Sequence, residues 1–153
     1  MGHLQTNKAD KAAGLFQAVH TVDSLRVAQA LNKERLKRSL PPLLCLLEVN
    51  VAGEAQKFGL PPALAEAGEL LRQCAELAGL KLAGLMCMAP YTERPEATSR
   101  PVFRRLRELL AEANAKGCYP TPLTELSMGM SQDYAIAIEE GATMVRVGTA
   151  LFE

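Results

Sequence analysis

Leu43-Leu44-Cys45-Leu46-Leu47-Glu48-Val49-Asn50-Val51 is the stretch that decides the fold, because it is apolar almost throughout. A strand with one solvated face alternates apolar and polar residues, whereas a strand covered on both faces, as in a parallel sheet, does not. Short β-like runs, several of them equally apolar, occur at residues 18–22, 81–88, 123–128 and 144–147. The sequence therefore predicts five strands of a parallel sheet.

Helical patterns separate these runs. Apolar residues recur at helical spacing in the segments 25–31, 64–78, 102–113 and 135–138, and a short helix is expected before the first strand, over residues 7–16. Repeated strand-then-helix order implies right-handed crossovers and an α/β architecture.

Capping residues mark the expected helix ends. Asp23 and Ser131 are placed to cap two of the helices, and Pro101 suits the first turn of a third. Glycines follow three of the helical patterns, at positions 79, 117 and 141.

The number of strands bears on the kind of α/β fold. Five parallel strands can form an open sheet, but an α/β barrel needs eight strands and roughly 250 residues. Read as a barrel, the chain is a partial (β/α)8 (TIM) barrel that lacks the first strands, and its abrupt entry into a helix after Met1 agrees with a missing front portion. We expect residues 1–153 to form a single domain.

Composition excludes several classes of protein. The 17 Lys and Arg residues balance 17 Asp and Glu, so the chain lacks the positive excess of a nucleic-acid binder. The apolar runs are far shorter than the ~20 residues of a membrane span, and no secretory signal opens the chain. The four cysteines show no metal-binding spacing, so we expect reduced, buried thiols in a cytoplasmic protein.

Two neighbouring strand ends suggest an anion site. Ser127-Met128-Gly129-Met130-Ser131 joins a strand to a helix expected to start near Ser131, and Gly148-Thr149 follows the final strand. Free N–H groups and hydroxyls at such turns favour an anion, and the loops after strands seven and eight of a barrel frequently bind phosphate. Each turn taken alone is better explained as a tight turn capped by Ser or Thr; together they predict a small phosphorylated ligand.

Three other kinds of residue are candidates for the site. Arg146 interrupts the apolar final strand and points into the barrel or cleft, where it hydrogen-bonds either a ligand or a structural carboxylate. Lys57 lies in a loop after a strand, where an amine can bind an anion or attack an aldehyde, or is simply an exposed loop lysine. His3 and His20 have no identifiable triad partners, and a lone strand histidine such as His20 is typically a packed residue.

A set of motifs makes a family recognisable. They are residues 2–8 (GHLQTNK), 50–54 (NVAGE), 57–60 (KFGL), 84–86 (GLM), 126–131 (LSMGMS) with Asp133, and 145–152 (VRVGTALF). The chain closely resembles the pyridoxal phosphate homeostasis proteins, the YggS-like group, over essentially its whole length. That family is a single-domain relative of the alanine racemase barrel and carries pyridoxal 5′-phosphate (PLP) as a Schiff base on a lysine.

The resemblance implies a function and a site. The family buffers or delivers PLP in vitamin B6 homeostasis as a non-catalytic carrier, with apo PLP-dependent enzymes as recipients. By resemblance, Ser127, Gly129, Gly148 and Thr149 surround the phosphate, with Ser131 close by. By the same resemblance, Arg146 and His3 lie near the cofactor, and Lys57 matches a second lysine implicated in transfer.

The departure from the family is at the start of the chain. The resemblance implies a Schiff-base lysine at the end of the first strand, and the chain begins after that position, matching the C-terminal two-thirds of the family domain. We therefore expect a chain that keeps the phosphate half of the site without the principal lysine, and whose open barrel exposes strand edges. The alternatives are a PLP-dependent racemase-like enzyme and an unrelated phosphate-binding α/β protein.

Overall fold

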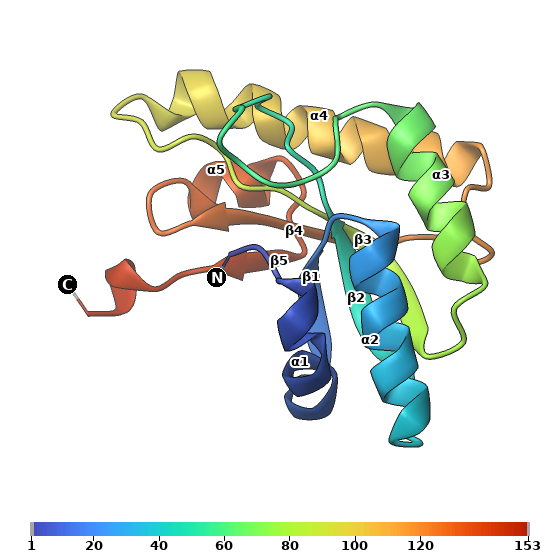
Figure 1. The fold of residues 1–153 in the computed structure, drawn as a ribbon. Coiled ribbons are helices and arrows are strands. Elements are labelled where there is room, and N and C mark those ends of the chain that lie inside the picture. The colour runs from blue at the N-terminus through green and yellow to red at the C-terminus, as the bar shows by residue number, and fades with distance from the viewer. Residues whose placement is uncertain (1, 153) are drawn as a thin grey trace.

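The computed structural model describes residues 2–152 and contains five strands and five α-helices (Figure 1). The strands are β1 (Ala18–Val22), β2 (Leu43–Glu48), β3 (Leu80–Met86), β4 (Glu125–Met130) and β5 (Met144–Arg146). The helices are α1 (Ala9–Leu15), α2 (Leu25–Lys37), α3 (Leu64–Ala75), α4 (Pro95–Ala115) and α5 (Tyr134–Glu139). Two 3₁₀ turns, η1 (Thr6–Lys8) and η2 (Thr149–Leu151), lie near the two ends.

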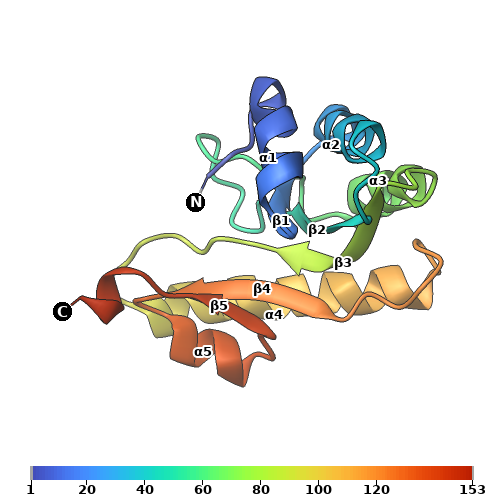
Figure 2. The same cartoon turned by 90° about the horizontal axis from the view of Figure 1, so that it is seen from below.

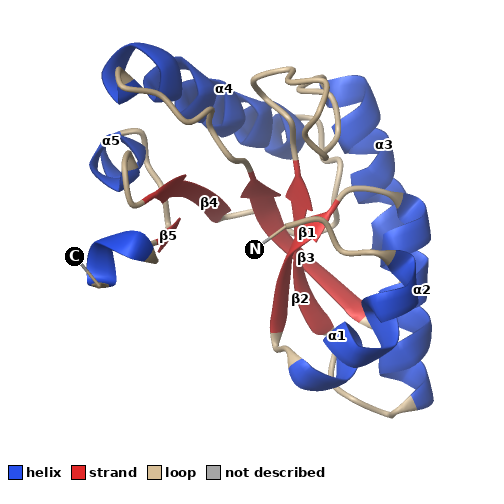
Figure 3. Cartoon of the chain, turned by 60° about the vertical axis from the view of Figure 1, so that its left-hand side comes forward, coloured by secondary structure: helices blue, strands red, loops and turns tan. Residues whose placement is uncertain are grey.

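The five strands form one parallel sheet in the order β1-β2-β3-β4-β5. The sheet is strongly curved, with α1, α2 and α3 against the outer side of one arm and α4 and α5 against the other (Figure 2). Seen from another side, the helices again lie outside the strands (Figure 3). This arrangement confirms the predicted α/β fold: a half-barrel whose strands all end at the same rim.

The two faces of the sheet carry different side chains. Leu43, Cys45 and Leu47 are fully buried in the core between sheet and helices. On the neighbouring strands Glu48 pairs with Met86, and Met86 pairs with Ser127. Residues in one such row point to the same side of a sheet, opposite to their chain neighbours, so this row lies on the concave face. The four cysteines are free and buried, as expected.

Three helices begin elsewhere than predicted. The cap of α2 is Ser24, whose hydroxyl accepts the Val27 N–H at 3.4 Å, because the Asp23 carboxylate is occupied by His3. Helix α4 begins at Pro95, so Pro101 lies inside it. The last helix begins at Tyr134, because the Ser131 hydroxyl binds another loop.

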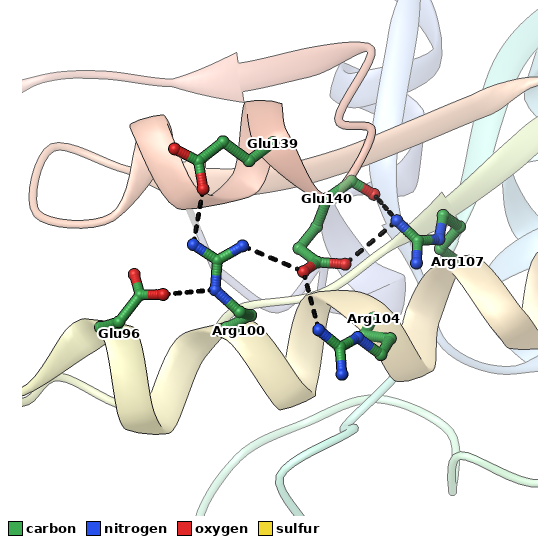
Figure 4. Close-up of polar contacts among 6 residues, drawn as sticks. All are labelled: Glu96, Arg100, Arg104, Arg107, Glu139 and Glu140. Carbon is green, nitrogen blue, oxygen red and sulfur yellow. Dashed lines mark hydrogen bonds and ion pairs between the residues drawn. The ribbon is translucent and has the colours of Figure 1, made fainter.

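An ion-pair network fastens α5 to α4 (Figure 4). The Glu140 carboxylate, at the end of α5, is almost fully buried and lies 3.1 Å from Arg100, 3.3 Å from Arg104 and 3.0 Å from Arg107. Burial alone would raise the pKa of Glu140, but the hydrogen bonds from Arg100 and Arg104 and the charges of Arg104 and Arg107 outweigh it and hold the pKa below its usual value. Three arginines of α4 therefore hold the end of α5 in place.

No helix between residues 2 and 152 is both long enough and apolar enough to span a bilayer.

Candidate functional site

A cavity of about 690 Å³ opens at the rim where the strands end. We call it the rim cavity. Its walls come from the loops that follow β2, β3, β4 and β5, and the polar groups on them belong to Glu54, Lys57, Tyr91, Ser131, Gln132 and Thr149. Because the strands are parallel, loops far apart in sequence converge here, as ligand-binding loops do in α/β folds.

Ser131 joins the last two of these loops. Its hydroxyl oxygen accepts the backbone N–H groups of Gly148 and Ala150, each at 3.2 Å. Since a hydroxyl has two lone pairs and one hydrogen, these two bonds leave its O–H free to donate into the rim cavity. The predicted convergence of the two strand ends is thus made through Ser131.

The Ser131 loop is held in place by Asp133. The Asp133 carboxylate accepts the Met130 N–H at 2.7 Å and the Ser99 hydroxyl of α4 at 2.8 Å, and both side chains are buried. Gly129 has a φ of +94°, and a Cβ there would lie 2.6 Å from the Ala137 Cβ. Gly129 therefore allows β4 to approach α5 closely.

The loop carrying Lys57 is organised by Asn50. The Asn50 amide donates to the backbone oxygens of Glu54 (2.8 Å) and Lys57 (3.3 Å) and accepts the Glu54 N–H at 3.2 Å. The Lys57 ammonium pairs with the Glu54 carboxylate and donates to the Ala89 carbonyl at 3.3 Å. Lys57, whose ammonium these contacts hold at a fixed place, therefore lines the rim cavity together with Ser131 and Thr149.

A second cavity, of about 520 Å³, lies beside the first; we call it the His20 cavity. His3, His20, Met86 and Arg146 are among the residues that line it, and Met88 lines both cavities. Its polar groups therefore come from the N-terminal segment, β1 and β5.

Arg146 is the centre of a polar cluster on this concave face. Its guanidinium donates to the Ser127 hydroxyl at 2.6 Å and to the Cys87 carbonyl at 2.9 Å, so Arg146 points inward, as predicted. Ser127 also lies 2.9 Å from His20 Nδ1. Burial, and then the charge of Arg146, lower the pKa of His20, which is therefore a neutral imidazole at neutral pH.

His3 links the N-terminal segment to the Lys57 loop. Its Nδ1 lies 2.7 Å from the Asp23 carboxylate, and its ring stacks on Phe58 with centroids 4.0 Å apart. Glu48 lies close by, almost fully buried, with no hydrogen-bond partner for its Oε2 among the described residues. Burial, and then the nearby Asp23 charge, raise the pKa of Glu48.

The predicted site residues fall into three places. Lys57, Ser131 and Thr149 line the rim cavity, and Gly148 is bound to Ser131 beside it. His3 and Arg146 line the His20 cavity, with Ser127 behind Arg146. Gly129 packs against α5.

Sequence reasoning missed four residues that shape the site: Asn50, Ser99, Asp133 and His20. The Asn50 signal was available, since an Asn that precedes a loop commonly binds the backbone a few residues on. The contacts of Ser99 and His20 join residues 34 and 107 positions apart, so no local pattern indicates them.

Space for a ligand remains beside Gly148, next to the rim cavity. Gly148 has φ −132° and ψ −79°, and a Cβ there would meet no protein atom within 4 Å. Contacts with neighbouring protein atoms therefore do not require a glycine at position 148. Groups of three His, Cys, Asp or Glu residues placed to hold a metal are absent from residues 2–152.

Comparison with known proteins agrees with this description. The family model for the alanine racemase N-terminal domain matches residues 1–153. Pyridoxal phosphate homeostasis proteins of Aquifex aeolicus and Pseudomonas aeruginosa are 43% and 47% identical to the chain over 152 and 157 residues, each match covering 99% of the chain. The chain spans 64% and 62% of the lengths of these two relatives.

Solved structures show the same fold. PipY of Synechococcus elongatus, solved without PLP, has a TM-score of 0.88 at 35% identity and covers all of this chain, which in turn covers 69% of PipY. The PLP-bound form of PipY has a TM-score of 0.86 at 34% identity. An alanine racemase of Clostridium difficile, 15% identical with a TM-score of 0.69, shares the fold.

The chain belongs to the alanine racemase N-terminal domain family. Within that family it groups with PipY and the pyridoxal phosphate homeostasis proteins, as the sequence motifs predicted.

Proposed function

We propose that residues 1–153 form one PLP-binding domain, which acts in vitamin B6 homeostasis as a non-catalytic carrier. The observation that supports this most directly is the rim cavity, where the free O–H of Ser131, the Thr149 hydroxyl and the Lys57 amine face one space. Donors from several loops around one space suit a phosphate group. The names of the relatives and the PLP-bound form of PipY support the same ligand.

The residues divide the binding between them. Ser131 and Thr149 would donate to the phosphate beside Gly148, and Lys57 would add a positive charge at the rim. His20 and Arg146 would border the ring from the neighbouring cavity, since Met88 lines both. PLP, when bound, supplies an aldehyde that combines reversibly with amines. The Lys57 amine lies where it can receive or release that group.

A carrier role requires reversible binding, and Lys57 suits it. The Lys57 ammonium already has partners in Glu54 and the Ala89 carbonyl, so it can return to them when the ligand leaves. We further propose that the protein works in the cytoplasm and passes PLP to apo PLP-dependent enzymes.

Equilibrium dialysis against PLP tests the proposal. We expect saturable binding, competition by inorganic phosphate, and an affinity about tenfold or more lower in Ser131→Ala, because one hydrogen bond to a charged group is lost. Thr121→Ala changes an exposed residue before β4, away from the rim, and serves as the control. Binding that does not saturate, or equal affinities for the two variants, would contradict the proposal.

A further inference from the structure

The hydrogen bond between Ser127 and His20 has a direction that the structure fixes. Arg146 can only donate, so at 2.6 Å the Ser127 oxygen accepts from it. The Ser127 side chain is completely buried, so its own hydrogen needs an acceptor. Among the described residues, the only remaining partner of this hydroxyl is His20 Nδ1, at 2.9 Å. Ser127 therefore donates to His20.

This direction sets the protonation of the His20 ring. If Nδ1 accepts a hydrogen bond, it carries no proton, and the single proton of the neutral ring is on Nε2. The low pKa of His20, caused by burial and by the charge of Arg146, agrees with a neutral ring. The chain Arg146→Ser127→His20 thus ends in an N–H donor on a residue that lines the His20 cavity.

Arg146 places a positive charge beside this donor, which favours an anion, and the buried Glu48 carboxylate offsets part of that charge. Arg146 lines the same cavity. His3 also lines this cavity, and its Nδ1 is bound to the Asp23 carboxylate. Glu48 is the other carboxylate nearby, and its Oε2 has no hydrogen-bond partner among the described residues. Glu48 is buried in the sheet beside Met86 and is not part of the cavity lining, whereas the Arg146 and His20 side chains are.

We propose that His20 is a ligand-binding residue, whose Nε2–H donates to an oxygen anion of the ligand held beside Arg146. This inference rests on the proposed function, which it deepens. Two sources share the chemistry: the ionised ring hydroxyl of PLP, and the carboxylate of an amino acid.

The tautomer can be measured without any ligand. The chain has two histidines, so ¹⁵N–¹H correlation spectra of the rings are assigned with a single His3→Gln variant. We expect His20 to show a protonated Nε2 and an unprotonated Nδ1 at neutral pH, and to lose this preference in Ser127→Ala. A proton on Nδ1, or a doubly protonated ring, would overturn the inference.

A matched pair of variants tests the binding role. Gln places its amide nitrogen near the position of Nε2, and Asn places its amide near that of Nδ1. If the ring hydroxyl is the partner, PLP affinity falls about tenfold or more in His20→Asn, and much less in His20→Gln. Equal losses in the two variants for PLP and also for L-alanine would overturn the role of His20 as a donor.

The two oxygen sources are separated with a PLP analogue that lacks the ring hydroxyl, and with L-alanine. If the hydroxyl is the partner, the difference between the two His20 variants disappears with the analogue. If a carboxylate is the partner, the difference appears in L-alanine binding and not in the binding of PLP or the analogue, which carry no carboxylate; its absence from all three ligands overturns the inference. If the unaltered chain does not bind PLP, the proposed function and the ring-hydroxyl assignment are both refuted. The measurement of the His20 tautomer and the L-alanine experiment would still decide whether His20 is a donor.

Discussion

Two positions near the site, 129 and 148, are occupied by glycine for different physical reasons. Gly129 has a φ of +94° and no room for a Cβ, because Ala137 and the backbone of Tyr134 are in the way. Gly148 has a negative φ of −132° and open space around it. The protein itself requires the first glycine, and the proposed ligand accounts for the second.

Alanine substitutions separate these two reasons. We expect Gly148→Ala to unfold like the unaltered chain but to bind PLP about tenfold or more weakly, since the added methyl group takes ligand space. Gly129→Ala should lower the free energy of unfolding by about 1–3 kcal/mol or more, from backbone strain and steric clash. Urea unfolding and equilibrium dialysis measure the two effects. A destabilised Gly148→Ala, or one with unchanged affinity, would contradict this explanation.

The sequence indicated the residue types of the site better than their contacts. The inward direction of Arg146 followed from its apolar neighbours, and it is confirmed. The partners of Ser127 and Ser131 could not be predicted, because each depends on the register between β4 and β5 and on loop paths. The phosphate role given to Ser127 stays a prediction; its hydroxyl already has two partners, Arg146 and His20.

At the scale of elements, the packing of α5 depends on a single buried carboxylate. Helix α5 has only six residues, too few to be stable alone, and Glu140 follows it directly. Three arginines of α4 surround this carboxylate, and Arg107 also donates to the Glu140 carbonyl at 3.0 Å. Because α5 packs on β4, and Ser131 directly follows β4, the network also helps to hold the Ser131 loop in place.

Replacing Glu140 by Gln tests this support. The pKa of Glu140 is lowered in the folded state, so the ionised carboxylate stabilises the folded chain at pH values above the ordinary glutamate pKa of about 4.3. This stabilisation is lost as the pH falls through the lower pKa of the folded state. We expect Glu140→Gln to lower Tm by at least about 2 °C at pH 7, a difference that shrinks below about pH 4. Thermal unfolding at several pH values measures it.

Glu139→Gln is the matched control. Glu139 is largely exposed and contacts Arg100 alone among these arginines. Its replacement should change Tm less than that of Glu140 at pH 7. Equal effects of the two substitutions, or a Glu140→Gln effect that does not depend on pH, would contradict the proposed support.

Elements were predicted well where burial determines the pattern. The five apolar runs are the five strands, with ends within three residues, because strands covered on both faces have few polar residues. The start of α4 was misplaced because Ser99 is polar, yet buried against Asp133, so the apolar pattern underestimates the length of the helix.

At the scale of the whole molecule, the described sheet has two free edges, at β1 and β5. Large apolar side chains are exposed next to the β1 edge, including Leu15 and Phe16, and Phe16 also lines the His20 cavity. Free edges beside exposed apolar surface favour pairing between chains. The α/β class followed from the alternating strand and helix patterns, and the partial barrel predicted from the strand count and the family resemblance is confirmed by the curved sheet (Figure 2).

Concentration-dependent self-association is the expected result. Sedimentation velocity at increasing protein concentration should show larger species, and Phe16→Lys should reduce them by placing a charge beside the edge. Leu36→Lys, on the exposed side of α2, is the control because it replaces a similarly exposed apolar residue away from both edges. A species distribution that is independent of concentration, or equal effects of the two lysines, would contradict this expectation.

Met88 lines both cavities, so its side chain affects which shapes of ligand the protein can bind. A methionine side chain is flexible and polarisable, so it adjusts to different neighbours at little cost. The wall that the two cavities share can therefore change shape, which suits an elongated ligand with one anionic end and one aromatic end. We expect oxidation of the Met88 thioether to a sulfoxide to make this shared wall more polar and to weaken ligand binding, even though the four thiols are buried.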